Sequence, residues 1–179
     1  AGIASEPFDI DQLEEVLRIL ERLKAAGYAP DGMVDVHLLP ERYDAQLVLN
    51  LCNIIEARKD LITRALGLTE EVRIIVGEDL AFGVPLDVFS IETMEACIHL
   101  LRQSTIQAAA VGKARMKPCD DSNPKFQMRS WLLRLGFIVE EFARPRRTLL
   151  QNLEGNGAFF DDQGKERAAA RRRAQRMIG

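Results

Sequence analysis

The sequence predicts an α+β fold, in which a small three-stranded sheet is packed with helices and is followed by a C-terminal two-helix hairpin and a basic tail. Apolar residues recur at three- and four-residue steps over several stretches, which is typical of amphipathic helices. Three short runs rich in Val, Ile and Leu are bounded by Gly or Pro and indicate strands. Together these patterns give the element order α-β-α-β-β-α, then α-α.

Helices in the first part of the chain are expected where an apolar stripe is closed by a glycine, which suits the end of a helix. Ser90 can accept a hydrogen bond from a free backbone N–H group and therefore cap the third of them. The expected helices are 10–26 before Gly27, 44–66 before Gly67, and 91–111 before Gly112.

The strands are expected at 33–38, 72–76 and 80–84, with residues 77–79 forming a hairpin turn between the last two. A helix follows the first strand, and such a helix can cross over a sheet. This order would place the first strand parallel to a neighbour beside the hairpin.

The charge is divided unevenly along the chain. Residues 1–110 carry 9 basic and 19 acidic side chains, a net charge of −10. Residues 111–179 carry 15 basic and 8 acidic side chains, a net charge of +7. Such asymmetry indicates either an anionic partner for the basic half or contact between the two halves.

Four regions follow from these patterns. The tail has high helix propensity and almost no apolar face, so it is either a solvated helix or a segment that binds an acidic surface or nucleic acid. The regions are an N-terminal helix in residues 1–30, a β-α-β-β-α core in 31–112, a linker and helical hairpin packed on the core in 113–160, and a basic Ala/Arg-rich tail in 161–179.

The helical hairpin has the clearest boundaries. Asn123 before Pro124 is a strong helix start, because Asn caps free N–H groups and Pro lacks one. Gly136 suits the left-handed end of the first helix. Pro145 removes a hydrogen bond from the second helix, which should kink or restart there. The apolar faces are formed by Met128, Trp131, Leu132 and Leu135 in the first helix and by Phe142, Leu149, Leu150 and Leu153 in the second.

The basic residues of this hairpin are the candidate binding site for nucleic acid or another partner. One interpretation is a helix-turn-helix, in which the second helix meets DNA. The other is a hairpin packed on the domain with a solvated basic face, which the acidic pair Glu140-Glu141 at the start of the second helix favours, since acids repel phosphate. The candidate residues are Lys125, Arg129, Arg134, Arg144, Arg146 and Arg147.

The hairpin also resembles a family of proteins, the "virulence-related" proteins carried on mobile elements of Gram-positive gut bacteria, whose function is unsettled. Two positions depart from the family pattern, which usually has Gly at Val139 and Ala at Pro145. The family supplies no established catalytic residues. The resemblance is carried by Met128, Arg129, Leu132–Ile138, Glu141, Phe142, Arg146, Arg147, Leu149, Leu150, Leu153, Gly155-Asn156 and Ala158-Phe159.

The sequence shows no pattern of a known reaction. The glycines form no phosphate loop, and no Gly-x-Ser-x-Gly motif is present. Cys52, Cys97 and Cys119 lie too far apart in sequence for a zinc site or a redox pair, so we expect reduced thiols. We therefore expect no catalytic residues, no cofactor and no metal, and a cytoplasmic protein without a membrane partner.

Two functions remain open. The leading hypothesis is a non-enzymatic macromolecule-binding protein of a mobile genetic element, a phage or plasmid accessory protein. It would inhibit a host defence nuclease by protein-protein contact, as anti-CRISPR proteins do, with its acidic half mimicking nucleic acid. The alternative is a nucleic-acid-binding accessory protein that uses the basic C-terminal half. An enzyme is the least favoured class.

Overall fold

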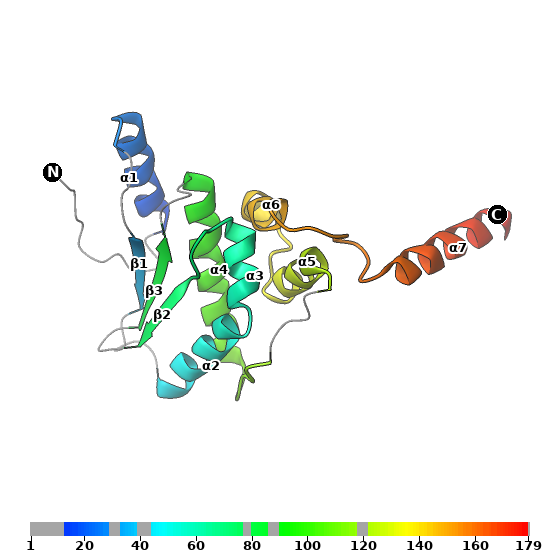
Figure 1. The fold of residues 1–179 in the computed structure, drawn as a ribbon, viewed down its shortest axis with the longest axis horizontal. Coiled ribbons are helices and arrows are strands. Elements are labelled where there is room, and N and C mark those ends of the chain that lie inside the picture. Colours follow the sequence, from blue (N-terminus) through cyan, green and yellow to red (C-terminus); the bar gives the residue numbers. More distant parts are fainter. Residues whose placement is uncertain are drawn as a thin grey trace.

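The computed structural model describes residues 13–28, 33–38, 44–76, 80–85, 90–117 and 122–178. In Figure 1, α4 lies in the middle of the molecule, with the strands on one side and α5 and α6 on the other. The elements in chain order are α1 (Leu13–Ala25), β1 (Met33–Leu38), α2 (Ala45–Glu56), α3 (Lys59–Leu66), β2 (Arg73–Val76), β3 (Leu80–Pro85), α4 (Ile91–Ala110), α5 (Pro124–Arg134), the 3-10 turn η3 (Glu140–Phe142), α6 (Ala143–Gln151) and α7 (Asp162–Ile178).

The central helix, α4, is buried on most of its circumference. Ser90 caps its start by accepting a hydrogen bond from the Thr93 N–H at 2.9 Å, as the sequence predicts. α2 and α6 both pack against it. A helix covered from several sides needs apolar or small residues all round rather than along one stripe. The buried positions of α4 are Ile91, Met94, Ala96, Cys97, Ile98, Leu100, Leu101, Ser104, Thr105 and Ala108.

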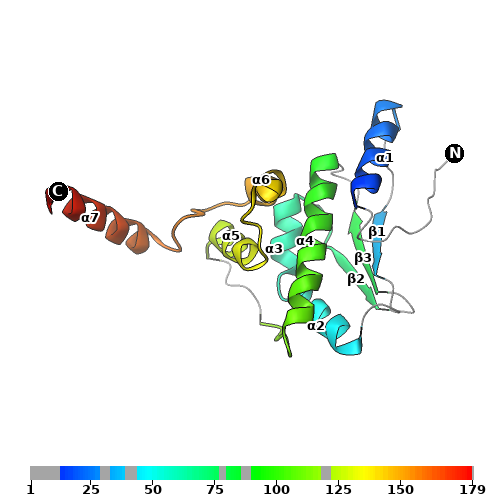
Figure 2. The ribbon, with the colours of Figure 1, turned by 180° about the vertical axis from the view of Figure 1, so that it is seen from behind.

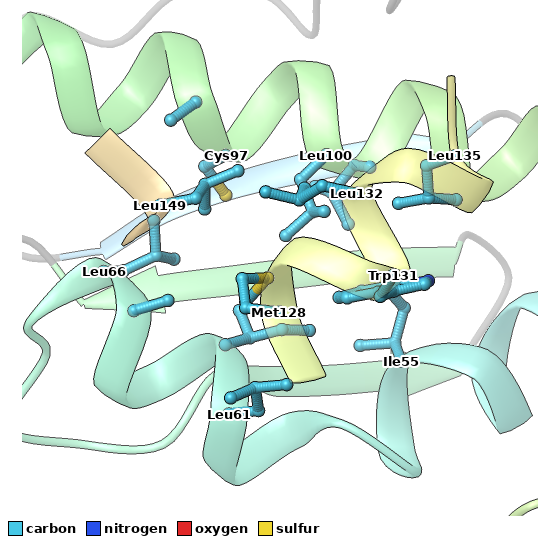
Figure 3. Packing of buried hydrophobic residues seen from close by; sticks show 14 of the residues in the cluster. Ile55, Leu61, Leu66, Cys97, Leu100, Met128, Trp131, Leu132, Leu135 and Leu149 are labelled. Atoms are coloured by element: carbon cyan, nitrogen blue, oxygen red, sulfur yellow. The ribbon is translucent and has the colours of Figure 1, made fainter. Parts of the chain in front are cut away.

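Helix α5 fills the space between α4 and the α2–α3 pair (Figure 3). Trp131 points towards Ile55 of α2, while Leu132 and Leu135 lie beside α4 near Leu100. Trp131 is 1% exposed and Leu135 is 4% exposed. The prediction that these two side chains are buried in the core is confirmed.

The long helix predicted over 44–66 is divided in two at Arg58, whose φ is −130°. The Arg58 guanidinium donates a hydrogen bond to the Ile54 carbonyl oxygen at 3.1 Å. It also lies 4.8 Å from the centroid of the Trp131 ring, a cation–π contact. No Gly or Pro marks the break in the sequence, and the contact with α5 is one that the local pattern does not contain. Gly67 ends α3, as predicted, and does so in the left-handed conformation.

The strands pair in the order β1-β3-β2, and both pairs are antiparallel. The predicted parallel pair is therefore wrong. β1 occupies the free edge of β3, from Met33 opposite Pro85 to Leu38 opposite Leu80, so β1 and β2 lie on either side of β3. The predicted turn at 77–79 lies outside the described residues.

The core that the structure describes is helical, and this corrects the predicted fold class. Its buried apolar side chains come from α2 to α6 and their connections, with Val72 at their edge. The prediction of an α+β fold, a sheet packed with helices, is wrong in this part of the chain, where helices cover one another instead. An apolar stripe predicts a helix but does not say which surface the stripe covers.

The α5–α6 hairpin begins and turns as the sequence predicts. Asn123 accepts a hydrogen bond from the Phe126 N–H at 3.1 Å and caps α5. After α5 the Gly136 N–H bonds to the Leu133 carbonyl and the Phe137 N–H to the Leu132 carbonyl. Gly136 has a φ of 86°, so this is a Schellman motif, which requires a left-handed residue.

Pro145 explains where the second helix of the hairpin begins. η3 makes a single 3-10 turn, and α6 restarts at Ala143. Pro145 therefore lies in the first turn of α6, where a residue without an N–H group costs little. The predicted restart is confirmed, and Pro145 itself is buried.

The predicted ends of two other helices have different outcomes. α4 stops at Ala110, one residue before the predicted end, and Gly112 after it has no positive φ. α1 is described from Leu13, and the predicted start of this helix at residue 10 lies outside the described residues.

Candidate functional site

The six candidate cations of the hairpin fall into two groups. The first makes hydrogen bonds or ion pairs within the protein, and the second makes none with the described residues. Arg144 belongs to the first group. Its guanidinium contacts Glu92 at 3.1 Å and Glu95 at 3.2 Å, and both acids lie in the first part of α4. The pKa of Glu92 is lowered mainly by a backbone hydrogen bond at the start of α4, and the charge of Arg144 lowers it further. Arg144 thus ties α6 to α4.

Arg146 and Arg129 also have structural partners. Arg146 is half-buried and donates a hydrogen bond to the Phe137 carbonyl at 2.5 Å, which closes the turn between α5 and η3. Arg129 donates to the Gly157 carbonyl at 3.2 Å and holds the segment that follows α6. A charged donor on a carbonyl stabilises the fold, so these two side chains are not fully available to a partner.

Lys125, Arg134 and Arg147 form the second group. Arg134 and Arg147 are exposed, and Lys125 is half-buried. Their side chains make no hydrogen bond or ion pair within the part of the chain that the structure describes. The structure therefore brings the predicted residues into one hairpin but leaves these three as its available charges.

The packing of α6 agrees with the packed-hairpin interpretation. Pro145, Thr148 and Leu149 of α6 are buried, and α6 packs against α3, α4 and α5. The opposite face of α6 is exposed at Arg144 and Arg147. The acidic pair Glu140-Glu141 lies just before this face, and acids repel phosphate at the position where a recognition helix meets DNA.

Helix α7 is the basic tail, for which the sequence left open a solvated helix or a segment that binds an acidic surface or nucleic acid, and none of its residues was among the six candidates. It stands apart from the body of the molecule in both views of the chain (Figures 1 and 2). Asp161 caps its start, accepting a hydrogen bond from the Gly164 N–H at 2.7 Å. Its described basic side chains, Lys165, Arg167, Arg171 and Arg173, are exposed. The sequence signal was the Ala/Arg composition, which predicted a helix without an apolar face.

The acids of the first half are partly occupied by cations of the protein. Lys59 contacts Glu71 at 2.8 Å, and Glu92 and Glu95 contact Arg144. The Lys59 contact raises the pKa of that lysine, mainly through its hydrogen bond with Glu71. An acidic surface that mimics nucleic acid would need such carboxylates to face a partner.

A small group of exposed apolar side chains lies where α5 meets η3. Leu133 is 41% exposed, Ile138 is 67% exposed and Val139 is 52% exposed. Single exposed apolar residues are common on protein surfaces, whereas large contiguous apolar patches are typical of interaction sites.

The described residues show no arrangement for metal chemistry. No group of three or more His, Cys, Asp or Glu residues among them could hold a metal ion. Cys52 and Cys97 are free thiols, and burial raises the pKa of Cys97 to about 12. Cys119 lies outside the described residues. Among the helices that the structure describes, none is both long enough and apolar enough to span a membrane.

Comparison of the chain with protein-family models, with curated proteins and with solved structures found no match.

Proposed function

We propose that this protein is a non-enzymatic nucleic-acid-binding protein that contacts phosphates through its basic C-terminal part. The contacts of the acidic and basic side chains support this choice between the two hypotheses drawn from the sequence. Several acids of the first half are paired with cations of the protein, whereas the cations of α7 and part of the hairpin are exposed.

The observation that carries the proposal is the position and charge of α7. The helix has 17 residues, which corresponds to a length of about 26 Å. Double-stranded DNA carries about one negative charge per 1.7 Å of its axis, so a surface of this length faces many phosphates. Residues 167–178 contain no acid, and Ala168, Ala169 and Ala170 leave the backbone little covered. A cationic helix with small side chains can approach a phosphate backbone closely.

The hairpin supplies a second set of charges. Arg134 and Arg147 are exposed, and neither is paired with a described residue. Cations on separate elements favour an extended polyanion over a compact anionic ligand. Phosphate contacts fix a protein on a duplex without reading its sequence. We therefore expect weak, sequence-independent binding.

A second candidate function is protein contact through the exposed Leu133, Ile138 and Val139. Inhibition of a defence nuclease by protein-protein contact would belong to this class. A mobile-element origin for the protein is part of this second proposal, and it is supported by the resemblance of the hairpin to the "virulence-related" family. A partner bound through this surface would be retained in a pull-down after nuclease treatment, and Ile138→Glu would release it.

The test compares two variants with the same change in charge. In the first, Arg167, Arg171 and Arg173 of α7 are replaced by Gln; in the second, Arg18, Arg22 and Lys24 of α1 are replaced by Gln. Loss of about three phosphate contacts should weaken binding roughly 10- to 100-fold at physiological salt for the α7 variant. The α1 variant should bind nearly as the unmodified chain does. Fluorescence anisotropy on a labelled random duplex measures both, and equal affinities would contradict the proposal.

A further inference from the structure

The segment 111–117, between α4 and α5, carries exposed cations at alternate positions. Lys113, Arg115 and Lys117 are exposed, Met116 is 61% exposed, and Ala114 is half-buried. The surrounding sequence from residue 96 to residue 119 contains no acid. None of these cations belongs to the candidate site in the hairpin.

Two asparagines of α2 hold this segment in place. Asn50 is 1% exposed, and its amide nitrogen donates to the Ala108 carbonyl at 3.1 Å and to the Val111 carbonyl at 2.8 Å. Its amide oxygen accepts from the Ala114 N–H at 2.9 Å and from Gln46 at 3.0 Å. The Asn53 amide donates to the Ala114 carbonyl at 3.2 Å.

These bonds explain why α4 ends where it does and why the segment has a defined course. The Asn50 amide occupies the carbonyls of Ala108 and Val111 at the end of the helix. Both backbone groups of Ala114 are bonded to α2, so the chain is held at the residue between Lys113 and Arg115. A buried Asn with all its hydrogen bonds made is a rigid support.

We propose that Lys113, Arg115 and Lys117 form a second, preorganised contact with the phosphate backbone of nucleic acid. Fixing a binding segment before it meets its ligand reduces the entropy lost on binding. The three side chains are exposed cations on a short stretch of chain, which suits successive phosphates better than a single anion. This inference rests on the proposed function and adds a binding surface to it.

The first test is a lysine footprint on the full chain. An amine-reactive reagent labels the protein with and without a random DNA duplex, and mass spectrometry reports each lysine. Lys113 and Lys117 should become protected together with Lys165 of α7, whereas Lys24 of α1 should not. Protection of Lys165 without Lys113 and Lys117 would overturn this inference and leave the proposed function standing. Protection of none of these lysines would overturn both.

The second test separates charge from positioning. Replacing Lys113, Arg115 and Lys117 by Gln should weaken binding roughly 10- to 100-fold and reduce the slope of log Kd against log salt by about 2.7. Asn53→Ala keeps every cation but releases one bond to Ala114, so it should weaken binding several-fold without changing the slope. An unchanged affinity in the triple variant would contradict the inference.

The same assay distinguishes nucleic acid from an acidic protein. Polyglutamate at equal charge concentration should displace the duplex poorly, because its carboxylates are not spaced like phosphates along a stiff backbone. If polyglutamate competes as well as unlabelled DNA does, the segment is a general anionic contact and the proposed preference for phosphate is wrong. Thermal melts of each variant establish that it is folded.

Discussion

At the residue scale, asparagine amides join segments that lie far apart in sequence. Asn123 is 7% exposed, and its amide nitrogen donates to the carbonyls of Asn156, Phe159 and Phe160, while its oxygen caps α5. Gly155 lies so close that a Cβ there would be 2.4 Å from the Asn123 amide oxygen. One side chain therefore starts the hairpin and anchors the chain that leads to α7.

Asn123→Ala should lower the free energy of unfolding by about 1–3 kcal/mol, since it removes a helix cap and the donor that bonds three carbonyls. Asn123→Asp is the informative control. It retains the oxygen that caps α5 but places a carboxylate against three carbonyls, so it should also destabilise the protein. Urea melts measure both changes. If Asn123→Asp is as stable as the unmodified protein, the amide bonds contribute nothing.

His99 is expected to make stability depend on pH. It lies edge-on to Phe142, with ring centroids 5.3 Å apart. Burial, and then the charge of Arg102, lower its pKa from the ordinary value of 6.5, while Glu141 acts in the opposite direction. The unfolded chain therefore binds a proton more readily than the folded protein does.

The contribution of His99 to the free energy of unfolding is therefore complete above about pH 6.5, the pKa of histidine in the unfolded chain. It is lost as the pH falls through the lower pKa that His99 has in the folded protein. The free energy of unfolding should decrease when the pH is lowered through this range, and His99→Gln should reduce that dependence. Urea melts at stepped pH values measure it. An identical pH dependence in the His99→Gln variant would mean that other groups cause it.

At the element scale, the α5–α6 hairpin is part of the core. Leu135 is 4% exposed beside α4, whereas Leu133, two residues earlier, is 41% exposed. Leu135→Ala should cost about 2–5 kcal/mol of stability because it leaves a cavity. Leu133→Ala should cost less than about 1 kcal/mol, since little buried surface is lost. Similar losses for the two leucines would show that the hairpin does not pack as described.

The hairpin also shows which features can be predicted from sequence. The caps at Ser90 and Asn123 and the left-handed Gly136 depend on a few adjacent residues, so local chemistry predicts them. The cation–π contact of Arg58 and the antiparallel place of β1 involve residues distant in sequence. The periodicity of apolar residues along the chain does not predict contacts between distant residues. It therefore also does not predict that α4, rather than a sheet, lies at the centre of the molecule.

The candidate site was predictable only in part. The sequence identifies the basic residues of the hairpin, but a pattern cannot tell a cation that binds a carbonyl from one that faces a partner. Arg146 and Arg129 bond to the backbone and Arg144 to acids of α4, which leaves Lys125, Arg134 and Arg147 without such a bond to a described residue. The supports of segment 111–117 come from α2, about 60 residues earlier, a contact that arises from folding and not from local pattern.

At the scale of the whole molecule, the uneven charge has two consequences. Part of it is neutralised internally, because Arg144 of the basic half contacts Glu92 and Glu95 of the acidic half. The remainder is presented on segment 111–117, the hairpin and α7. Of these, the hairpin and α7 lie on the side of α4 away from the strands (Figure 2). A field of one sign over part of a surface speeds association with a polyanion.

The central claim is that this protein binds nucleic acid through exposed cations of its C-terminal part. The most direct measurement is a salt titration of the unmodified protein on a labelled random duplex by fluorescence anisotropy. About five cations of α7 and the hairpin reach phosphates in this account, and segment 111–117 adds about three, so log K should fall against log salt with a slope of roughly −4.5 to −7. Kd should be about micromolar or weaker at physiological salt. Absence of binding at low salt, or tight binding that does not depend on salt, would contradict the claim.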